Sequence, residues 1–147
     1  VLCIGGNHCR LASSNKEDSH QGASHILAEF MKYALPEVKV EWSHKLLKHE
    51  IGNLEFLMSH GDKKFVNKDF NRLMYMHGSQ DKFTTLLTGH YHSIKIHHDE
   101  MYGRHIALTS LFTVNTYSDL GGWTTKPGFA IFSESDFVTL VHEDISL

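Results

Sequence analysis

Residues 83–92 read "FTTLLTGHYH", an apolar run followed by a glycine and two histidines that flank a tyrosine. The run is typical of a strand, and the glycine lets the backbone turn sharply where the strand ends. One such turn presents two imidazoles, His90 and His92, and imidazole is the commonest metal ligand in proteins. Taken alone the pair also fits a polar hairpin turn, so its meaning depends on how other segments end.

Two further apolar runs end in a similar way. The run "LCI" leads into Gly-Asn-His, and the run "LEFLM" leads into Ser-His-Gly-Asp. In open α/β sheets, ligand groups gather just beyond the carboxyl ends of the strands. An amide oxygen combined with imidazoles suits a borderline divalent ion such as manganese, iron or zinc. The side chains expected to meet in this pocket are Asn7, His8, His60, His90 and His92.

The remaining pattern predicts a mixed α/β protein. Apolar residues at helical spacing predict a helix over residues 24–35, ended by Pro36, and a second helix over residues 67–77 that turns Phe70, Leu73 and Met74 inward. The segment "HKLLKHEIGNLEFLM" reads as a hairpin with Gly-Asn at its turn. The later runs "HIALTSLF", "GFAIF" and "FVTLV" are expected to form one antiparallel group that serves as scaffold.

Composition bounds the class of protein. The 147 residues suit a single domain spanning 1–147, with 41% hydrophobic and 21% charged residues. A formal charge of −3 gives no general attraction to nucleic acid or anionic membranes. No apolar stretch approaches the roughly 20 residues of a membrane span. Cys3 and Cys9 form no disulfide framework, which favours a reducing compartment, the cytoplasm.

The motifs, taken in order, resemble the calcineurin-like metallophosphoesterase family. Its sequences carry an Asp-x-His strand end, a Gly-Asp-x-x-Asp element, Gly-Asn-His followed by an acid, an isolated histidine, and Gly-His-x-His. The last three occur here as "GNHC", "SHGD" and "GHYH", in that order and across nearly the whole chain. The surrounding loops are most similar to phage-type phosphoesterases, which would place the protein in a host cytoplasm.

The resemblance implies a fold and a metal site. The fold would be a layered β-sandwich flanked by helices, holding two divalent metal ions: manganese, iron or zinc. Asn7, His60 and His90 match the ligands of one ion, and His92 matches a ligand of the other. Two neighbouring ions bind phosphate oxygens and activate a water, which is the chemistry of phosphoester hydrolysis.

Two further residues match roles around the substrate. His8 matches the family's histidine that assists catalysis, by protonating the leaving oxygen or steadying the phosphoryl group. Arg10 lies two positions later, where its guanidinium fork suits phosphate oxygens. The expected reaction is therefore hydrolysis of a phosphomonoester or phosphodiester.

The sequence also departs from the family pattern. The Asp-x-His and Gly-Asp-x-x-Asp elements do not occur ahead of "GNHC", so we expect the carboxyl-terminal portion of an enzyme whose amino-terminal strands are missing. Cys9 stands where the family has an acid, and "DSH" at residues 18–20 lies in a polar loop rather than at a strand end. An incomplete site leaves a second interpretation open: a non-catalytic metal-binding or scaffold domain that keeps the fold.

The substrate stays open between nucleic acid and a nucleotide or other small molecule. Lys63, Lys64 and Lys68 could line a nucleic-acid groove or form a solvated face, while the acidic net charge favours a small substrate. The stretch "KIHHDE" at residues 95–100 suggests a second metal cluster, but it fits an exposed hairpin end better. Oligomeric state is not encoded in any motif.

Overall fold

The computed structural model describes residues 1–6, 9, 11, 22–61, 70–91, 95–99, 103–109, 128–132 and 139–142. No helix in these ranges is long and apolar enough to cross a membrane. In chain order the described elements are β1 (Leu2–Ile4), α1 (Ala23–Ala34), β2 (Glu41–Ser43), β3 (Leu47–Ile51), β4 (Leu54–Ser59), α3 (Phe70–His77), β5 (Phe83–Thr88), β6 (Lys95–Asp99), β7 (Gly103–Ala107), β8 (Gly128–Ile131) and β9 (Thr139–His142).

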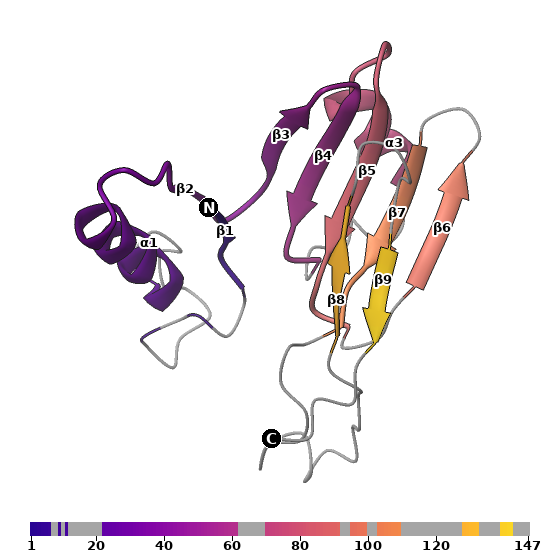
Figure 1. Cartoon of the computed structure of the whole chain (residues 1–147). Coiled ribbons are helices and arrows are strands. Elements are labelled where there is room, and N and C mark those ends of the chain that lie inside the picture. The colour runs from indigo at the N-terminus through magenta and orange to yellow at the C-terminus, as the bar shows by residue number, and fades with distance from the viewer. Residues whose placement is uncertain are drawn as a thin grey trace, which may run out of the picture.

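A five-stranded sheet forms the centre of the molecule, in the order β3-β4-β5-β7-β6 (Figure 1). The three inner strands are mutually parallel, and the edge strands β3 and β6 run antiparallel to their neighbours. Leu57, Leu86 and Ile106, one from each inner strand, are fully buried. β4 and most of β5 are buried along their length, as is expected of strands that are covered on both faces.

Two layers cover this sheet. On one face, Leu73 and Met74 of α3 pack against Leu57 and Leu86 in a buried apolar cluster. On the other face lies the antiparallel pair β8–β9, and the Phe132 ring that follows β8 contacts the Phe56 ring edge-on at 5.1 Å. Figure 1 shows α3 behind the sheet and β8–β9 in front of it. The layered α/β fold expected from the sequence is confirmed.

A smaller unit contains the amino-terminal elements. β1 and β2 pair in parallel, and the pairing continues with the Gly5 amide donating to the Ser43 carbonyl at 2.9 Å. α1 packs on these strands, where the Trp42 indole donates to the Ser24 hydroxyl at 3.1 Å. The helix predicted to stop before Pro36 ends at Ala34, as expected.

The structure confirms the hairpin and the place of the second helix. β3 and β4 pair antiparallel around a turn at Gly52-Asn53, as predicted. Residues 95–99 of the "KIHHDE" stretch form the edge strand β6, which is antiparallel to β7 and exposed over residues 95–97, consistent with a hairpin end. Leu73 and Met74 point inward as predicted; the side chain of Phe70 lies outside the described set.

The expectation of one antiparallel tail group was wrong. Its first strand, β7, joins β5 in parallel and belongs to the central sheet, whereas β8 and β9 form a separate antiparallel pair. An apolar run does not record the direction of its neighbour. Here β6 turns the chain back, so β7 enters the sheet parallel to β5 and lies between β5 and β6.

Candidate functional site

The predicted ligands His60 and His90 lie side by side at the carboxyl ends of β4 and β5. The last residues of these parallel strands, Ser59 and Thr88, are register partners. The Gly89 amide then donates to the His60 carbonyl at 3.0 Å, which carries the pairing past the strand ends. The imidazole rings have centroids 5.1 Å apart and planes inclined at 70°. The parallel pairing of two strands therefore brings these two histidines together.

The turn that carries His90 has an unusual backbone. His90 has a φ of 72°, in the left-handed region, which is uncommon for residues other than glycine and costs roughly 1–3 kcal/mol. Tyr91 holds this conformation with its amide, which donates to the Gly89 carbonyl at 2.9 Å, and with its hydroxyl, which donates to the Gly61 carbonyl at 3.2 Å. Such strain is typical of functional sites, because the surrounding contacts must impose it.

The end of β1 reaches the same place through Gly6. A Cβ atom built on Gly6 would lie 3.0 Å from Cε1 and 3.2 Å from Nδ1 of His60. The backbone of Gly6 is therefore packed directly against the His60 imidazole. Because Gly6 immediately precedes Asn7, all three predicted strand ends approach one point.

The other predicted site residues lie outside the described part of the chain. This applies to the predicted ligands Asn7 and His92 and to His8 and Arg10. The three lysines named for a possible nucleic-acid groove also lie outside the described residues. Within the described residues, no group of three or more histidine, cysteine or acidic side chains is arranged to hold a metal ion. Cys9 is a half-buried free thiol. The roles assigned to the undescribed residues stay predictions.

The separation of the two described imidazoles can be compared with the spacing expected for a shared metal ion. Two imidazoles on one zinc, each with a nitrogen about 2.0–2.1 Å from the metal, hold their ring centroids roughly 4.5–5 Å apart. The observed 5.1 Å is close to this spacing, and it also lies within the ordinary range of ring–ring contacts, about 4.5–7 Å. The separation of the two rings is therefore compatible with a shared ion and equally with an ordinary contact between two rings.

Substituting Gly6 with alanine should weaken metal binding. The added methyl would meet the His60 ring at 3.0–3.4 Å, closer than ordinary contact, and so would push the imidazole from its position. We expect a loss of about tenfold in zinc affinity, the size typical when groups that position a ligand are changed. Gly89→Ala is the matched control, because its Cβ would meet nothing closer than the His60 carbonyl oxygen at 3.7 Å. Competition with a chromogenic chelator measures both, and equal affinities would contradict the packing argument.

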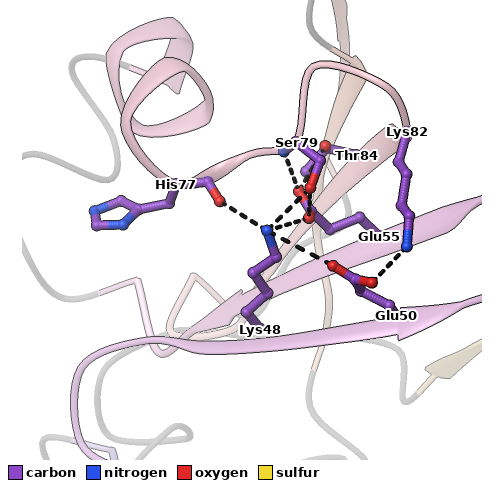
Figure 2. Close-up of polar contacts among 7 residues, drawn as sticks. All are labelled: Lys48, Glu50, Glu55, His77, Ser79, Lys82 and Thr84. Carbon is purple, nitrogen blue, oxygen red and sulfur yellow. Dashed lines mark hydrogen bonds and ion pairs between the residues drawn. The ribbon is translucent and has the colours of Figure 1, made fainter.

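A second polar cluster, which was not predicted from the sequence, lies near the amino ends of β4 and β5, at the other end of these strands from the two histidines (Figure 2). Glu55 near the start of β4 is fully buried and accepts hydrogen bonds from the Ser79 amide at 2.7 Å, from the Ser79 hydroxyl, and from the Thr84 hydroxyl at 2.9 Å. Lys48 of β3 forms an ion pair with the same carboxylate and donates to the Ser79 hydroxyl at 3.0 Å. An acid inside the apolar run "LEFLM" was the available signal, since a buried charge requires partners.

This cluster holds the connection between α3 and β5. Burial by itself raises the pKa of Glu55, but the hydrogen bonds from Lys48, Ser79 and Thr84 outweigh it, so the net pKa lies below the ordinary 4.5. The carboxylate is therefore ionised at neutral pH and saturated with donors. Since it lies near the amino ends of β4 and β5, it is separated from His60 and His90 by the length of the strands.

Behind the histidine pair, Thr88 contacts a histidine of the next strand. Its hydroxyl lies 2.8 Å from Nε2 of His105 on β7. Burial lowers the pKa of His105, and the nearby His97 lowers it further. The ring is therefore neutral at physiological pH. Thr88 immediately precedes the Gly89–His90 turn, so this contact helps to fix where that turn begins.

No protein-family model and no curated protein sequence matches this chain. Several solved structures are similar to it, including the following two. A Vps29 single mutant from Entamoeba histolytica has a TM-score of 0.43 and 14% identity, covering 72% of this chain and 63% of that one. A conserved uncharacterized protein of Streptococcus pneumoniae TIGR4, described as a predicted phosphoesterase, has a TM-score of 0.48 and 14% identity, covering 96% and 88%. Function must therefore be argued from this chain's own residues.

Proposed function

We propose that this chain carries the metal-binding part of a phosphoesterase, an enzyme that hydrolyses a phosphomonoester or phosphodiester with divalent metal ions. The observation that carries the proposal is the contact between the His60 and His90 imidazoles at the ends of two parallel strands, with Gly6 packed against His60. The order of the three motifs along the sequence supports the same reading, since each motif follows one of the strands β1, β4 and β5.

Each site residue has a separate role in the proposal. His60 and His90, together with Asn7, hold one ion, and His92 contributes to the second. When bound, the ions supply Lewis acidity toward the phosphoryl group and the attacking water. His8 delivers a proton to the leaving oxygen, and Arg10 binds and orients the phosphate oxygens.

The proposed substrate is a phosphate ester. These residues do not specify which group is esterified to the phosphate. Nucleic acid and nucleotides are both compatible with the proposal, because the ligands and His8 act only on the phosphoryl group. Manganese, iron and zinc all suit imidazole and amide ligands. A complete pair of ions would require carboxylate ligands, which the family supplies from Asp-x-His and Gly-Asp-x-x-Asp elements.

Metal titration tests the site directly. The 147-residue chain should bind about one zinc or manganese ion weakly, because three neutral ligands do not compensate the charge of a dication. His60→Ala and His90→Ala should each abolish this binding, as measured by calorimetry and by metal analysis after gel filtration. His77→Ala is the control, since His77 is exposed at the end of α3. Retained binding in both site variants would refute the metal site.

A hydrolysis assay distinguishes the proposed enzyme from the alternative interpretation, a non-catalytic domain with the same fold. The chain by itself should turn over a chromogenic bis-phosphodiester at close to the background rate. Joined to a segment with the family's two carboxylate elements, it should show manganese-dependent turnover, and His8→Ala should lower that turnover while leaving the metal content intact. If the extended protein binds metal fully but hydrolyses neither a monoester nor a diester, the scaffold interpretation is correct. Robust turnover by the 147-residue chain would instead place ligands in the site that we have not assigned.

A further inference from the structure

The turn after β5 has the hydrogen bond and the backbone angle of a strained γ-turn. The Tyr91 amide donates to the Gly89 carbonyl two residues earlier, at 2.9 Å, and His90 between them has a φ of 72°. A γ-turn with a positive φ at its central residue is rare, because a side chain at that residue strains the backbone. Contacts with other parts of the fold must therefore hold His90 in this conformation.

One such contact runs from the Tyr91 side chain to the segment that follows β4. Its hydroxyl donates to the Gly61 carbonyl at 3.2 Å, in a partly buried hydrogen bond. Gly61 is itself buried against the turn, where a Cβ built on it would lie 3.1 Å from the Gly89 carbonyl oxygen and 3.6 Å from Cβ of His90. One side chain therefore joins the residue after His90 to the residue after His60.

The ring of Tyr91 makes two further contacts. Its centroid lies 5.2 Å from that of the His90 imidazole, with the two planes inclined at 83°. The ammonium of Lys95, the first residue of β6, lies 5.5 Å from the centroid of the Tyr91 ring, within the range of a cation–π interaction. The His90 imidazole therefore contacts the Tyr91 ring as well as that of His60, and these contacts restrict its orientation.

We propose that Tyr91 is a positioning residue for the metal site, and that its hydroxyl, through the bond to Gly61, holds the His90 imidazole in place for the ion. This inference rests on the proposed function, because it takes His60 and His90 as ligands of one ion. Groups that orient a metal ligand from outside typically change metal affinity by about 10–100-fold when they are removed. In this role Tyr91 acts through His90 and is not itself a ligand.

Tyr91→Phe tests this role, since it removes the hydroxyl and keeps the ring that contacts His90 and Lys95. The zinc affinity of the 147-residue chain should fall about tenfold, as measured by competition with a chromogenic chelator. With saturating cobalt as the probe, the visible absorption bands of the bound ion should shift, because they report the geometry of its ligands. Tyr75→Phe is the matched control, since Tyr75 is a 72% exposed tyrosine of α3, and it should leave both readouts as in the wild type.

The cobalt spectrum separates positioning from a purely structural role of the hydroxyl. If the hydroxyl only stabilises the fold, Tyr91→Phe should lower the urea midpoint and leave the cobalt spectrum of the folded protein unchanged, and the proposal is then wrong. Equal zinc affinities in wild type and Tyr91→Phe would likewise refute the role of Tyr91, while the metal site would stand. A wild type that binds neither ion would refute the proposed function itself, and with it the role of Tyr91 toward the ion.

The strain at His90 can be measured without metal. If the Tyr91 hydroxyl imposes the positive φ, His90→Gly should unfold at a higher urea concentration than His90→Ala, because glycine adopts this φ without strain. The usual order is the reverse, since glycine gains more conformational freedom on unfolding. Both variants lack the imidazole, so the comparison does not depend on the metal site. In a Tyr91→Phe background the advantage of glycine should shrink or disappear. An advantage of the same size in both backgrounds would show that the backbone fixes the turn without Tyr91, and would overturn the proposal.

Discussion

Replacing Gly103 with alanine should strongly disrupt the central sheet. Gly103 has a φ of 125°, and a Cβ at this position would lie 2.0 Å from the carbonyl oxygen of Thr84, its register partner on β5. No side-chain rotation relieves this overlap, because both atoms are fixed to backbone. We expect the free energy of unfolding to fall by roughly 3 kcal/mol or more, a large part of the 5–15 kcal/mol typical of a domain.

The loss of stability should be greatest where β7 joins the sheet. β7 connects the edge strand β6 to β5, so separating β5 from β7 detaches two strands at once. Hydrogen exchange should show β6 and β7 amides losing protection while β3 and β4 retain theirs. Gly89→Ala, which adds the same methyl at an uncrowded site, should leave the urea midpoint nearly unchanged. A Gly103→Ala variant that unfolds at the wild-type midpoint would show that the β5–β7 contact relaxes freely.

The second large effect is expected at the buried carboxylate of Glu55. Removing the ammonium of Lys48, in Lys48→Met, leaves a fully buried negative charge with only its neutral donors from Ser79 and Thr84. We expect a loss of about 2 kcal/mol at pH 7, within the range measured when a charged hydrogen-bond partner is removed. Lys82→Met is the control, since Lys82 pairs with the half-exposed Glu50 at the surface, and it should change stability much less.

The pH dependence of the stability difference between wild type and Lys48→Met identifies the cause of the loss. In the wild type the pKa of Glu55 is lowered in the folded state, so its contribution is fully present above the unfolded value of 4.5 and is lost as pH falls through the lower folded value. Without Lys48, one of the interactions that lower the Glu55 pKa is lost, so the carboxylate takes up a proton at a higher pH than in the wild type. The difference between wild type and Lys48→Met should therefore be largest at neutral pH and shrink on acidification. It should also largely disappear in a Glu55→Gln background, and a difference that is independent of pH would point to lost packing of the lysine stem instead.

Local patterns in the sequence were sufficient for most of the elements. The apolar spacing that ends at Pro36 predicted α1, and Gly52-Asn53 between two strand-like runs predicted the β3–β4 hairpin. These features depend on periodicity and turn chemistry, which act over a few residues. The run "FTTLLTGHYH" likewise predicted the strand β5 and the sharp turn after it, because a glycine at the end of the run lets the backbone turn.

What only the tertiary structure decided is how distant segments pair. An apolar strand can have a parallel or an antiparallel neighbour, so nothing local to residues 103–107 specified that β7 would pair with β5. The burial of Glu55 beneath Lys48, Ser79 and Thr84 and the packing of Gly6 against His60 also join residues from separate elements. The sequence by itself predicted which residues could bind a metal, and it indicated where β4 and β5 end. His60 and His90 lie together only because β4 and β5 pair in parallel, so that both strands end on the same side of the sheet. Which strand becomes a neighbour, and in which direction, depends on contacts made across the whole fold.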